Sequence, residues 1–123
     1  MSAALAWMGC GVCGALGAWA RFRVGSGVMA RWTGAFPLGT FVVNLSGGCA
    51  LGVLTGLGLS GRGMLVLGTG LMGGYTTFST WMVEDQRLGE DGEWTLVWLY
   101  LFGSMAAGLL ATSLGWLIGS ALA

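Results

Sequence analysis

Long runs of apolar residues, separated by a few charged positions, dominate this 123-residue chain. The runs cover residues 2–22, 36–59, 64–83 and 94–122. Each is close to the roughly 20 residues that an α-helix needs to cross a bilayer. The connectors are too short to hold a soluble domain and cover residues 23–35, 60–63 and 84–93. The pattern therefore predicts a single all-α domain over residues 1–123, a multi-pass membrane protein of four transmembrane helices.

Composition supports the lipid bilayer as the solvent of this chain. Hydrophobic residues make up 55% of the sequence, charged residues make up 8%, and the mean hydropathy is +0.80. A soluble domain of this length has too high a surface-to-volume ratio to bury so much apolar surface. No basic segment precedes the first run, and its glycine spacing resembles that of the later runs. We therefore expect it to stay in the mature fold rather than act as a cleaved signal peptide.

The charged residues and cysteines exclude two classes of function. Five arginines and five acidic residues give a formal net charge of zero, and the chain has no histidine. Without a basic stripe, no nucleic-acid partner is expected. The acidic residues cluster in one connector and no cysteine lies near a base, so an enzyme is not expected. Cys10 and Cys13 have the spacing of a redox or metal pair, but they lack a second ligand pair, and we interpret them and Cys49 as small apolar residues.

Arginine positions give a weak indication of membrane orientation. Arg23, Arg31 and Arg87 fall on one side of the predicted bilayer, and Arg62 falls on the other. By the positive-inside rule, a chain with a single orientation would then keep both termini outside. The small bias is also compatible with insertion in both orientations.

Small residues recur at intervals of four along the runs. The sets are Gly48, Gly52 and Gly56; Gly115 and Gly119; and Gly14 and Ala18. In lipid, where the hydrophobic effect does not drive helices together, such spacing lets helix backbones approach closely. We therefore predict tight helix packing. A four-helix unit this small has little interior of its own, so a polar pathway is expected to need surfaces from more than one chain.

The stretch Gly73-Gly74-Tyr75-Thr76-Thr77-Phe78-Ser79-Thr80 places glycines and hydroxyls inside the third run. A helix interruption in hydrocarbon is tolerated only where it is buried in protein or lines a polar cavity, so we predict a third helix that is broken mid-membrane at a candidate site. Polar residues four apart, Thr40 with Asn44 and Tyr100 with Ser104, can face the same interior. Together with Arg21 at the end of the first run, these hydrogen-bond donors favour a small anion as ligand.

These motifs resemble the Fluc (CrcB) fluoride channel family. The resemblance rests on the third-run stretch above, on Phe36-Pro37-Leu38-Gly39-Thr40 leading to Asn44, on Gly14-Ala15 leading to Arg21-Phe22, and on Tyr100 with Ser104. It implies an antiparallel, dual-topology homodimer in the plasma membrane, with two fluoride pathways along the dimer interface. It also implies a structural sodium ion (Na+) at the dimer centre, held by the backbone carbonyls of Gly73 and Thr76, and no organic cofactor.

The resemblance also implies roles for individual side chains. The fluoride pathway would comprise Arg21, Thr40, Asn44, Phe78, Ser79, Thr80, Trp81, Tyr100 and Ser104. Arg21 would lie near the wide entrance, and Phe78 would present its ring edge to the ion. Glu84 matches an acid at the end of the family's third helix, and its role is left open. Trp81 replaces a second phenylalanine of the family; its larger ring could narrow the path, or its N–H could offer a hydrogen bond.

Passive electrodiffusion is the expected mechanism. Dehydrated fluoride would pass along donors that bind it strongly enough to let it enter and weakly enough to let it leave. A membrane potential that is negative inside favours outward movement of an anion by about 2.3 kcal/mol per charge per 100 mV. No nucleotide or catalytic pair is needed.

Three alternatives stay open at this point. The chain could be an obligate heterodimer subunit that needs a paralogous partner, which Trp81 and the arginine bias favour. A small proton-coupled drug exporter would need a titratable carboxylate within a run, and no acidic residue precedes Glu84. A purely structural membrane subunit would leave the intramembrane donors without a ligand. Fluoride flux measured on the isolated chain separates these alternatives.

Overall fold

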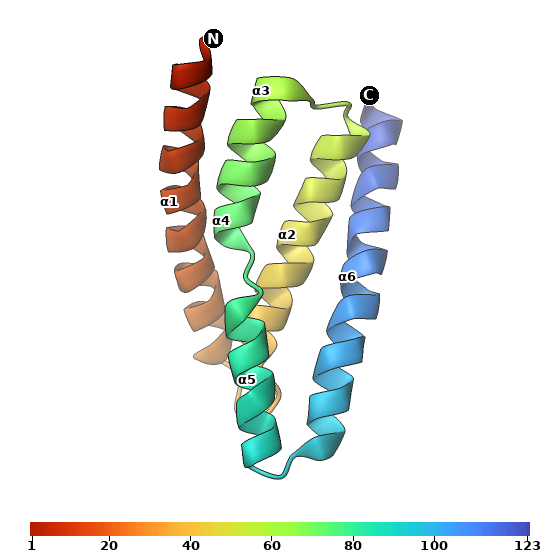
Figure 1. Ribbon diagram of the computed structural model, residues 1–123. Helices are drawn as coiled ribbons and strands as arrows, with labels where there is room; N and C mark the ends of the chain where they lie inside the picture. Colours follow the sequence, from red (N-terminus) through yellow and green to blue (C-terminus); the bar gives the residue numbers. More distant parts are fainter.

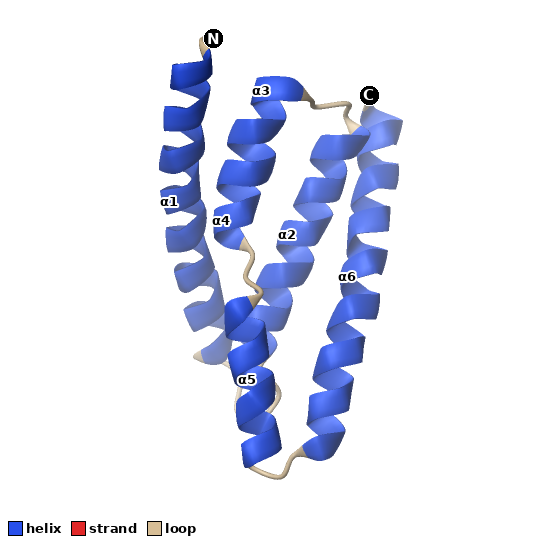
Figure 2. Cartoon of the chain, in the orientation of Figure 1, coloured by secondary structure: helices blue, strands red, loops and turns tan.

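The structure is a computed structural model that describes residues 1–123, and it contains helices and short connections but no strand (Figure 2). In chain order the elements are α1 (Ala3–Met29), α2 (Leu38–Gly56), α3 (Gly61–Gly63), the π-helical segment η1 (Met64–Met72), α4 (Gly73–Tyr75), α5 (Ser79–Glu90) and α6 (Trp94–Leu122). The predicted all-helical class is confirmed.

The helices lie alongside one another along one long axis (Figure 1). α1, α2 and α6 each form one rod, and α3, η1 and α4 continue into one another as the first half of a fourth rod, which α5 completes. Both termini lie at one end, and the α5–α6 connection lies at the other (Figure 1). α1, α2 and α6 are each long and apolar enough to cross a membrane. The fourth rod is divided, so it offers no single helix of that kind.

The fourth rod is interrupted at residues 76–78. α4 ends at Tyr75, Thr76 is extended with φ −81° and ψ 162°, and α5 begins at Ser79. The connection lies about halfway along the bundle (Figure 2). Before it, η1 winds more widely than an α-helix, and the N–H of Gly73 donates five residues back to Gly68. Such π-helical turns are rare and occur frequently at functional sites.

Glycines allow the backbones of α2 and α6 to come into direct contact. A methyl group on Gly52 would overlap the carbonyl oxygen of Thr112, and one on Gly115 would overlap the carbonyl oxygen of Cys49. A methyl group on Gly56 or Gly119 would likewise overlap the backbone of the opposite helix. The predicted close packing through small residues is therefore confirmed for this pair of helices. It fixes the distance between α2, which carries Thr40 and Asn44, and α6, which carries Tyr100 and Ser104.

A second glycine contact joins α1 to the first half of the fourth rod. A Cβ atom on Gly70 would lie 2.7 Å from the carbonyl oxygen of Cys10, and Gly74 and Gly17 leave equally little room. Gly14 belongs to this contact, because its carbonyl faces Gly74. The contact ends at Tyr75, directly before the interruption, and so holds the broken end of α4 against α1.

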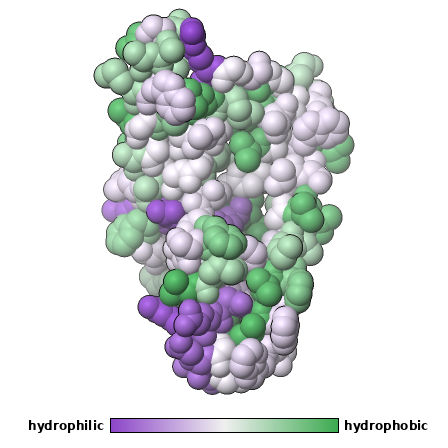
Figure 3. All heavy atoms as spheres, in the orientation of Figure 1, coloured by the Kyte–Doolittle hydropathy of each residue, from purple (hydrophilic) through white to green (hydrophobic).

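Most of the apolar surface has no partner within the chain. Only 13 of the 123 residues are buried, and the largest fully buried side chain is Tyr100. Tyr100 forms a small cluster with Leu88 and Val97 at the α5–α6 end. Hydrophilic side chains gather mainly at that end, with smaller groups at mid-height and at the end that carries the termini, and the remaining visible surface ranges from intermediate to apolar (Figure 3). This outer surface suits lipid or another subunit.

Two helices run further than the predicted spans. α1 continues through Arg23 to Met29, and α5 continues through Glu84 to Glu90, so the predicted connectors 23–35 and 84–93 are largely helical. The predicted spans end close to the first charged residues, because charges mark the limit of the hydrocarbon layer. The helices end instead at turns, such as the one closed by Gly92 with φ +76°.

Replacing Gly52 by alanine tests the α2–α6 contact. We expect Gly52→Ala to lower the free energy of unfolding by about 1–3 kcal/mol, because the added methyl group forces two backbones apart. Gly11→Ala is the matched control, since a Cβ there meets nothing within 4 Å and alanine is the better helix former. Thermal unfolding of the purified variants in detergent measures the difference. Equal melting temperatures would contradict the contact.

Candidate functional site

Asn44 pairs with the interrupted backbone through both ends of its amide. Its Nδ2 donates to the carbonyl oxygen of Thr77 at 2.8 Å, and the N–H of Thr77 donates to its Oδ1 at 2.8 Å. The half-buried side chain thus acts as a neighbouring peptide group would in a sheet. It satisfies the backbone N–H and the carbonyl of Thr77, which belongs to neither α4 nor α5. Backbone groups released by a buried break need such partners.

The pairing with Asn44 leaves a carbonyl of α4 without its usual partner. In an α-helix the oxygen of Gly73 would accept from the N–H of Thr77, four residues on, but that N–H is bonded to Asn44. Further into the break, the carbonyl of Thr76 accepts from Nη1 of Arg21 at 3.1 Å. The hydroxyl of Thr76 turns back to Met72 at 2.9 Å. The break therefore presents carbonyl oxygens, and Arg21 lies directly against them.

Thr77 also starts α5. The backbone N–H of Thr80 donates to Oγ1 of Thr77 at 3.3 Å, and the two hydroxyls lie 3.1 Å apart, with Thr77 as donor. A side-chain oxygen that accepts from the first free N–H groups of a helix stabilises its N-terminus. Thr77 was not among the predicted site residues. The signal that could have found it is its hydroxyl, three residues before Thr80 and within the stretch where the third helix was predicted to break.

Glu84 holds two predicted pathway residues together. Thr40 on α2 donates to its Oε1 at 2.7 Å, and Tyr100 on α6 donates to its Oε2 at 2.9 Å. Both carboxylate oxygens are thus occupied by neutral hydroxyl donors, and three helices meet at one side chain. Its role was left open by the sequence, because no spacing along the chain relates residue 84 to residues 40 and 100.

Aromatic rings line the contact of α5 with α6. Phe78 and Trp81 meet edge to face, with ring centres 5.8 Å apart at 85°, and Trp81 meets Tyr100 at 6.4 Å and 77°. Phe78 is 69% exposed, whereas Trp81 is half-buried. The exposed ring of Phe78 is free to meet a second surface, while Trp81 is fixed by its neighbours within the chain.

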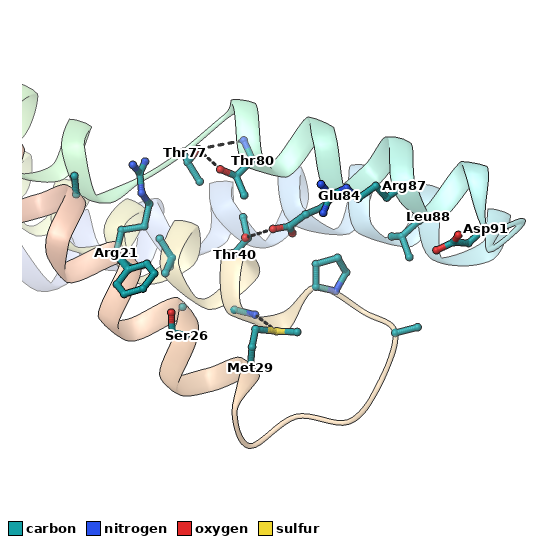
Figure 4. A pocket seen from close by; sticks show the side chains of 17 residues that line it. Arg21, Ser26, Met29, Thr40, Thr77, Thr80, Glu84, Arg87, Leu88 and Asp91 are labelled. Atoms are coloured by element: carbon teal, nitrogen blue, oxygen red, sulfur yellow. Dashed lines mark hydrogen bonds between the residues drawn. The ribbon is translucent and has the colours of Figure 1, made fainter.

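A cavity of about 620 Å³ opens between α1, α2 and α5 (Figure 4). Polar groups from three of the helices line it, namely Arg21, Thr40, Thr77, Thr80, Glu84 and Arg87. Arg21 approaches from α1, and Thr40 meets Glu84 across the cavity wall (Figure 4). No ion pair ties up Arg87, which the sequence reading had placed in a connector. The cavity thus joins two guanidinium groups to the hydroxyl-rich break.

The structure brings some of the predicted site residues together and separates others. Arg21, Thr40, Thr80 and Glu84 share the cavity, and Asn44 meets them through Thr77. Trp81, Tyr100 and Ser104 lie on the α5–α6 side and connect to the cavity through Glu84. Ser79 is exposed and its hydroxyl makes no hydrogen bond within the chain. A single chain therefore carries the predicted donors on two neighbouring faces rather than around one closed channel.

The fold and this site define a helical membrane protein that gathers hydrogen-bond donors around an interrupted helix. Comparison with known proteins makes the class more specific. The family model described as "CrcB-like protein, Camphor Resistance (CrcB)" matches residues 8–116. The chain belongs to this family, which confirms the resemblance drawn from its motifs.

Relatives cover nearly the whole chain. It is 44% identical over 94% of its length to "Fluoride-specific ion channel FluC 2" of Mycolicibacterium paratuberculosis, covering 94% of that protein. It is 42% identical over 96% of its length to FluC 2 of Moorella thermoacetica, covering 99%, and 43% identical over 94% to FluC 1 of Symbiobacterium thermophilum, covering 98%. These relatives are named as ion channels, so the expectation that the chain is not an enzyme is confirmed.

Truncating Asn44 tests its role at the break. We expect Asn44→Ala to lower the free energy of unfolding by about 1–3 kcal/mol, because both the N–H and the carbonyl of Thr77 lose their partner. Thr55→Ala is the control, since its hydroxyl bonds only to carbonyls of its own helix. Thermal unfolding in detergent compares the two. A loss at Asn44 no larger than at Thr55 would show that the pairing does not hold the break.

Proposed function

We propose that this chain is a subunit of a fluoride-selective channel through which fluoride leaves the cell passively across the plasma membrane. The observation that carries the proposal is its 42–44% identity over nearly its whole length to proteins named as fluoride-specific ion channels. The donor-rich break supports it, because a small anion that loses water needs N–H and O–H groups in its place. We place the break at mid-membrane depth.

Capture of the anion begins at the cavity. Its walls carry two arginines, Arg21 and Arg87, and two acids, Glu84 and Asp91, so its formal charge is balanced. Attraction of an anion therefore depends on Arg21, which lies against the break and binds the carbonyl oxygen of Thr76. From there the ion moves to neutral donors at the break, among them Thr80 and Ser79, and to the exposed ring edge of Phe78. Neutral donors release an anion more readily than a guanidinium does, which is what conduction requires.

Glu84 competes with the anion for donors. The hydroxyl hydrogens of Thr40 and Tyr100 point at its carboxylate, so fluoride that uses either hydroxyl must replace Glu84 as the acceptor. Exchange of one acceptor for another leaves no hydroxyl unpaired, but it takes donors from a carboxylate and brings the anion beside it, which keeps the binding weak. We therefore assign Glu84 the part of holding pathway donors in place while they are free of fluoride.

Trp81 and Ser104 offer donors that have no acceptor. Both the indole Nε1 and the hydroxyl Oγ are buried and make no hydrogen bond. A buried donor left unpaired costs about 1–3 kcal/mol, which binding of an anion would recover. The indole in place of the family's usual phenylalanine thus suits the pathway as a true hydrogen-bond donor rather than as a ring edge.

A second, antiparallel copy completes the channel in this proposal. The exposed ring of Phe78 and the apolar outer faces of the helices leave surface for it. A structural sodium ion fits the carbonyl oxygens at the break, because that of Gly73 lacks its helical partner and that of Thr76 has a lone pair beyond the one Arg21 uses. When bound, the ion would be coordinated by these oxygens and would join the two copies at their centre.

A heterodimer is the second candidate. The relatives carry the names FluC 1 and FluC 2, which point to paired channel proteins. In that case the opposite surface would come from a paralogous chain. The residues of this chain would keep the parts described above.

Flux through vesicles tests the function. We expect the purified chain, reconstituted alone into liposomes, to release fluoride and to retain chloride, since only the smaller anion repays its dehydration at these donors. A fluoride electrode and a chloride electrode follow the two ions after a potential is set with valinomycin. Asn44→Asp should lower the fluoride rate at least about tenfold, because a carboxylate accepts rather than donates and repels the ion.

The outcomes separate the candidates. Fluoride release by the chain alone supports the homodimer. Release that needs a co-expressed paralogue supports the heterodimer. Equal release of chloride and fluoride, or none with either partner, would overturn the proposal.

Removal of sodium tests the carbonyl site. We expect the dimer in detergent to dissociate at a higher protein concentration when sodium is replaced by N-methyl-D-glucamine. The carbonyl oxygens of the two breaks then face each other without a cation. Lithium and potassium salts at equal ionic strength serve as controls for general salt effects. Size-exclusion chromatography with light scattering measures the dimer fraction. A dimer fraction that is independent of sodium would contradict the site.

A further inference from the structure

Only three buried side-chain atoms in the chain lack a hydrogen-bond partner, and all three belong to α5 and α6. They are Nε1 of Trp81, Oδ1 of Asp85 and Oγ of Ser104. Trp81 and Asp85 are one turn apart on the same face of α5, and Ser104 follows Tyr100 by one turn on α6. Trp81 lies against Tyr100, so the three groups surround one contact. Such a concentration of unpaired groups calls for an explanation.

Asp85 differs from the other two because it carries charge. One of its two carboxylate oxygens, Oδ1, is withdrawn from water and receives no donor, and the side chain as a whole is half-buried. Burial raises the pKa of Asp85 above its ordinary value, since the charged form loses solvation. Neither the cavity nor the hydrogen bonds at Glu84 use this side chain.

The surroundings of Asp85 offer nothing to neutralise it. α5 packs against α6 and α2. On α6 the only titratable side chain is Tyr100, whose hydroxyl is given to Glu84, and α2 carries no charged residue. On α5 itself the charged neighbours are Glu84, Arg87 and Glu90, and no ion pair forms among them. No group of the chain therefore neutralises the carboxylate when it is ionised.

The charge of Asp85 matters because of what lies beside it. The indole N–H of Trp81 and the hydroxyl of Ser104 are the unpaired donors that suit a dehydrated anion. An ionised carboxylate one helical turn from Trp81 repels an anion that approaches the indole N–H. When the carboxyl is protonated, the repulsion disappears and an O–H group is added to the donors.

We propose that Asp85 makes fluoride passage proton-dependent, slowing it when ionised and permitting it when protonated. The inference rests on the proposed fluoride pathway. It identifies a controlling residue that lies beyond the predicted site residues. Fluoride flux through the chain rises as the pH falls, because protonation of Asp85 removes its charge.

The test compares pH profiles of two neutral variants with that of the unaltered chain. Flux from liposomes is measured with the same pH on both sides, from 7.5 to 5.5, so that orientation in the membrane does not matter. Protein-free liposomes at each pH give the background, since hydrogen fluoride crosses bilayers unaided. The unaltered chain should release fluoride about three- to tenfold faster at pH 5.5 than at pH 7.5.

Asp85→Asn should release fluoride at pH 7.5 as fast as the unaltered chain does at pH 5.5, with a flat profile. Asp85→Ser is the second variant, which keeps the test valid if the amide misfolds. Glu90→Gln is the control, because Glu90 is exposed at the end of α5, and its profile should match that of the unaltered chain.

The results distinguish this inference from the proposed function. If the unaltered chain conducts fluoride but both neutral variants keep its pH profile, the role of Asp85 is wrong and the channel stands. If the profile of the unaltered chain is already flat, the inference is also wrong. If the unaltered chain conducts no fluoride at any pH, the failure belongs to the proposed function.

Discussion

The pairing of the Asn44 amide with the backbone of Thr77 is the interaction on which the rest of the site depends. A helix can stop inside an apolar bundle only if the peptide groups that it releases find partners other than water. Asn44 supplies a donor and an acceptor in the geometry of a peptide group, at 2.8 Å each. With Thr77 satisfied in this way, the carbonyls of Gly73 and Thr76 and the start of α5 can be placed independently of α4.

Close approach of the helices makes this pairing possible. An asparagine side chain is short, so α2 must lie near the break for its amide to reach Thr77. Gly47 on α2 provides that approach, because a Cβ atom there would lie 3.0 Å from the ring of Tyr75, at the end of α4. Gly52 and Gly115 bring α6 to the same distance on the other side, and Tyr100 then reaches Glu84. The glycines thus position the polar groups as well as pack the helices.

Features that depend on local chemistry could be predicted from the sequence. The four apolar runs predicted the number of rods. The glycines and hydroxyls between Gly73 and Thr80 indicated where the third helix in chain order, which forms the fourth rod, would be interrupted. The spacing of Gly52 and its neighbours predicted close packing, because that spacing alone decides which face is smooth. The place of Arg21 at the end of an apolar run led to the prediction that it attracts an anion, which stays a prediction; the structure shows its hydrogen bond to the carbonyl oxygen of Thr76.

Features that depend on contacts between distant residues could not be predicted. Nothing along the chain indicates that Glu84 joins residues 40 and 100. The π-helical winding of η1 was also missed, since its apolar pattern reads equally well as an α-helix. Asp85 and Arg87 were taken for solvated connector residues, because a charge in sequence marks the end of a membrane span but not the end of a helix.

The site is built on competition for a limited set of donors. The hydroxyls of Thr40 and Tyr100 are held by a carboxylate, and the guanidinium of Arg21 is held by a carbonyl oxygen, so neither kind of donor is idle in the empty chain. An anion that uses the hydroxyl of Thr40 or Tyr100 gains it only by displacing a carboxylate that is already in place. Because the gain is then a difference between two hydrogen bonds, binding stays weak enough for the ion to leave. Only an anion that accepts hydrogen bonds more strongly than a carboxylate or a carbonyl makes that exchange favourable, which gives small, hard anions the advantage.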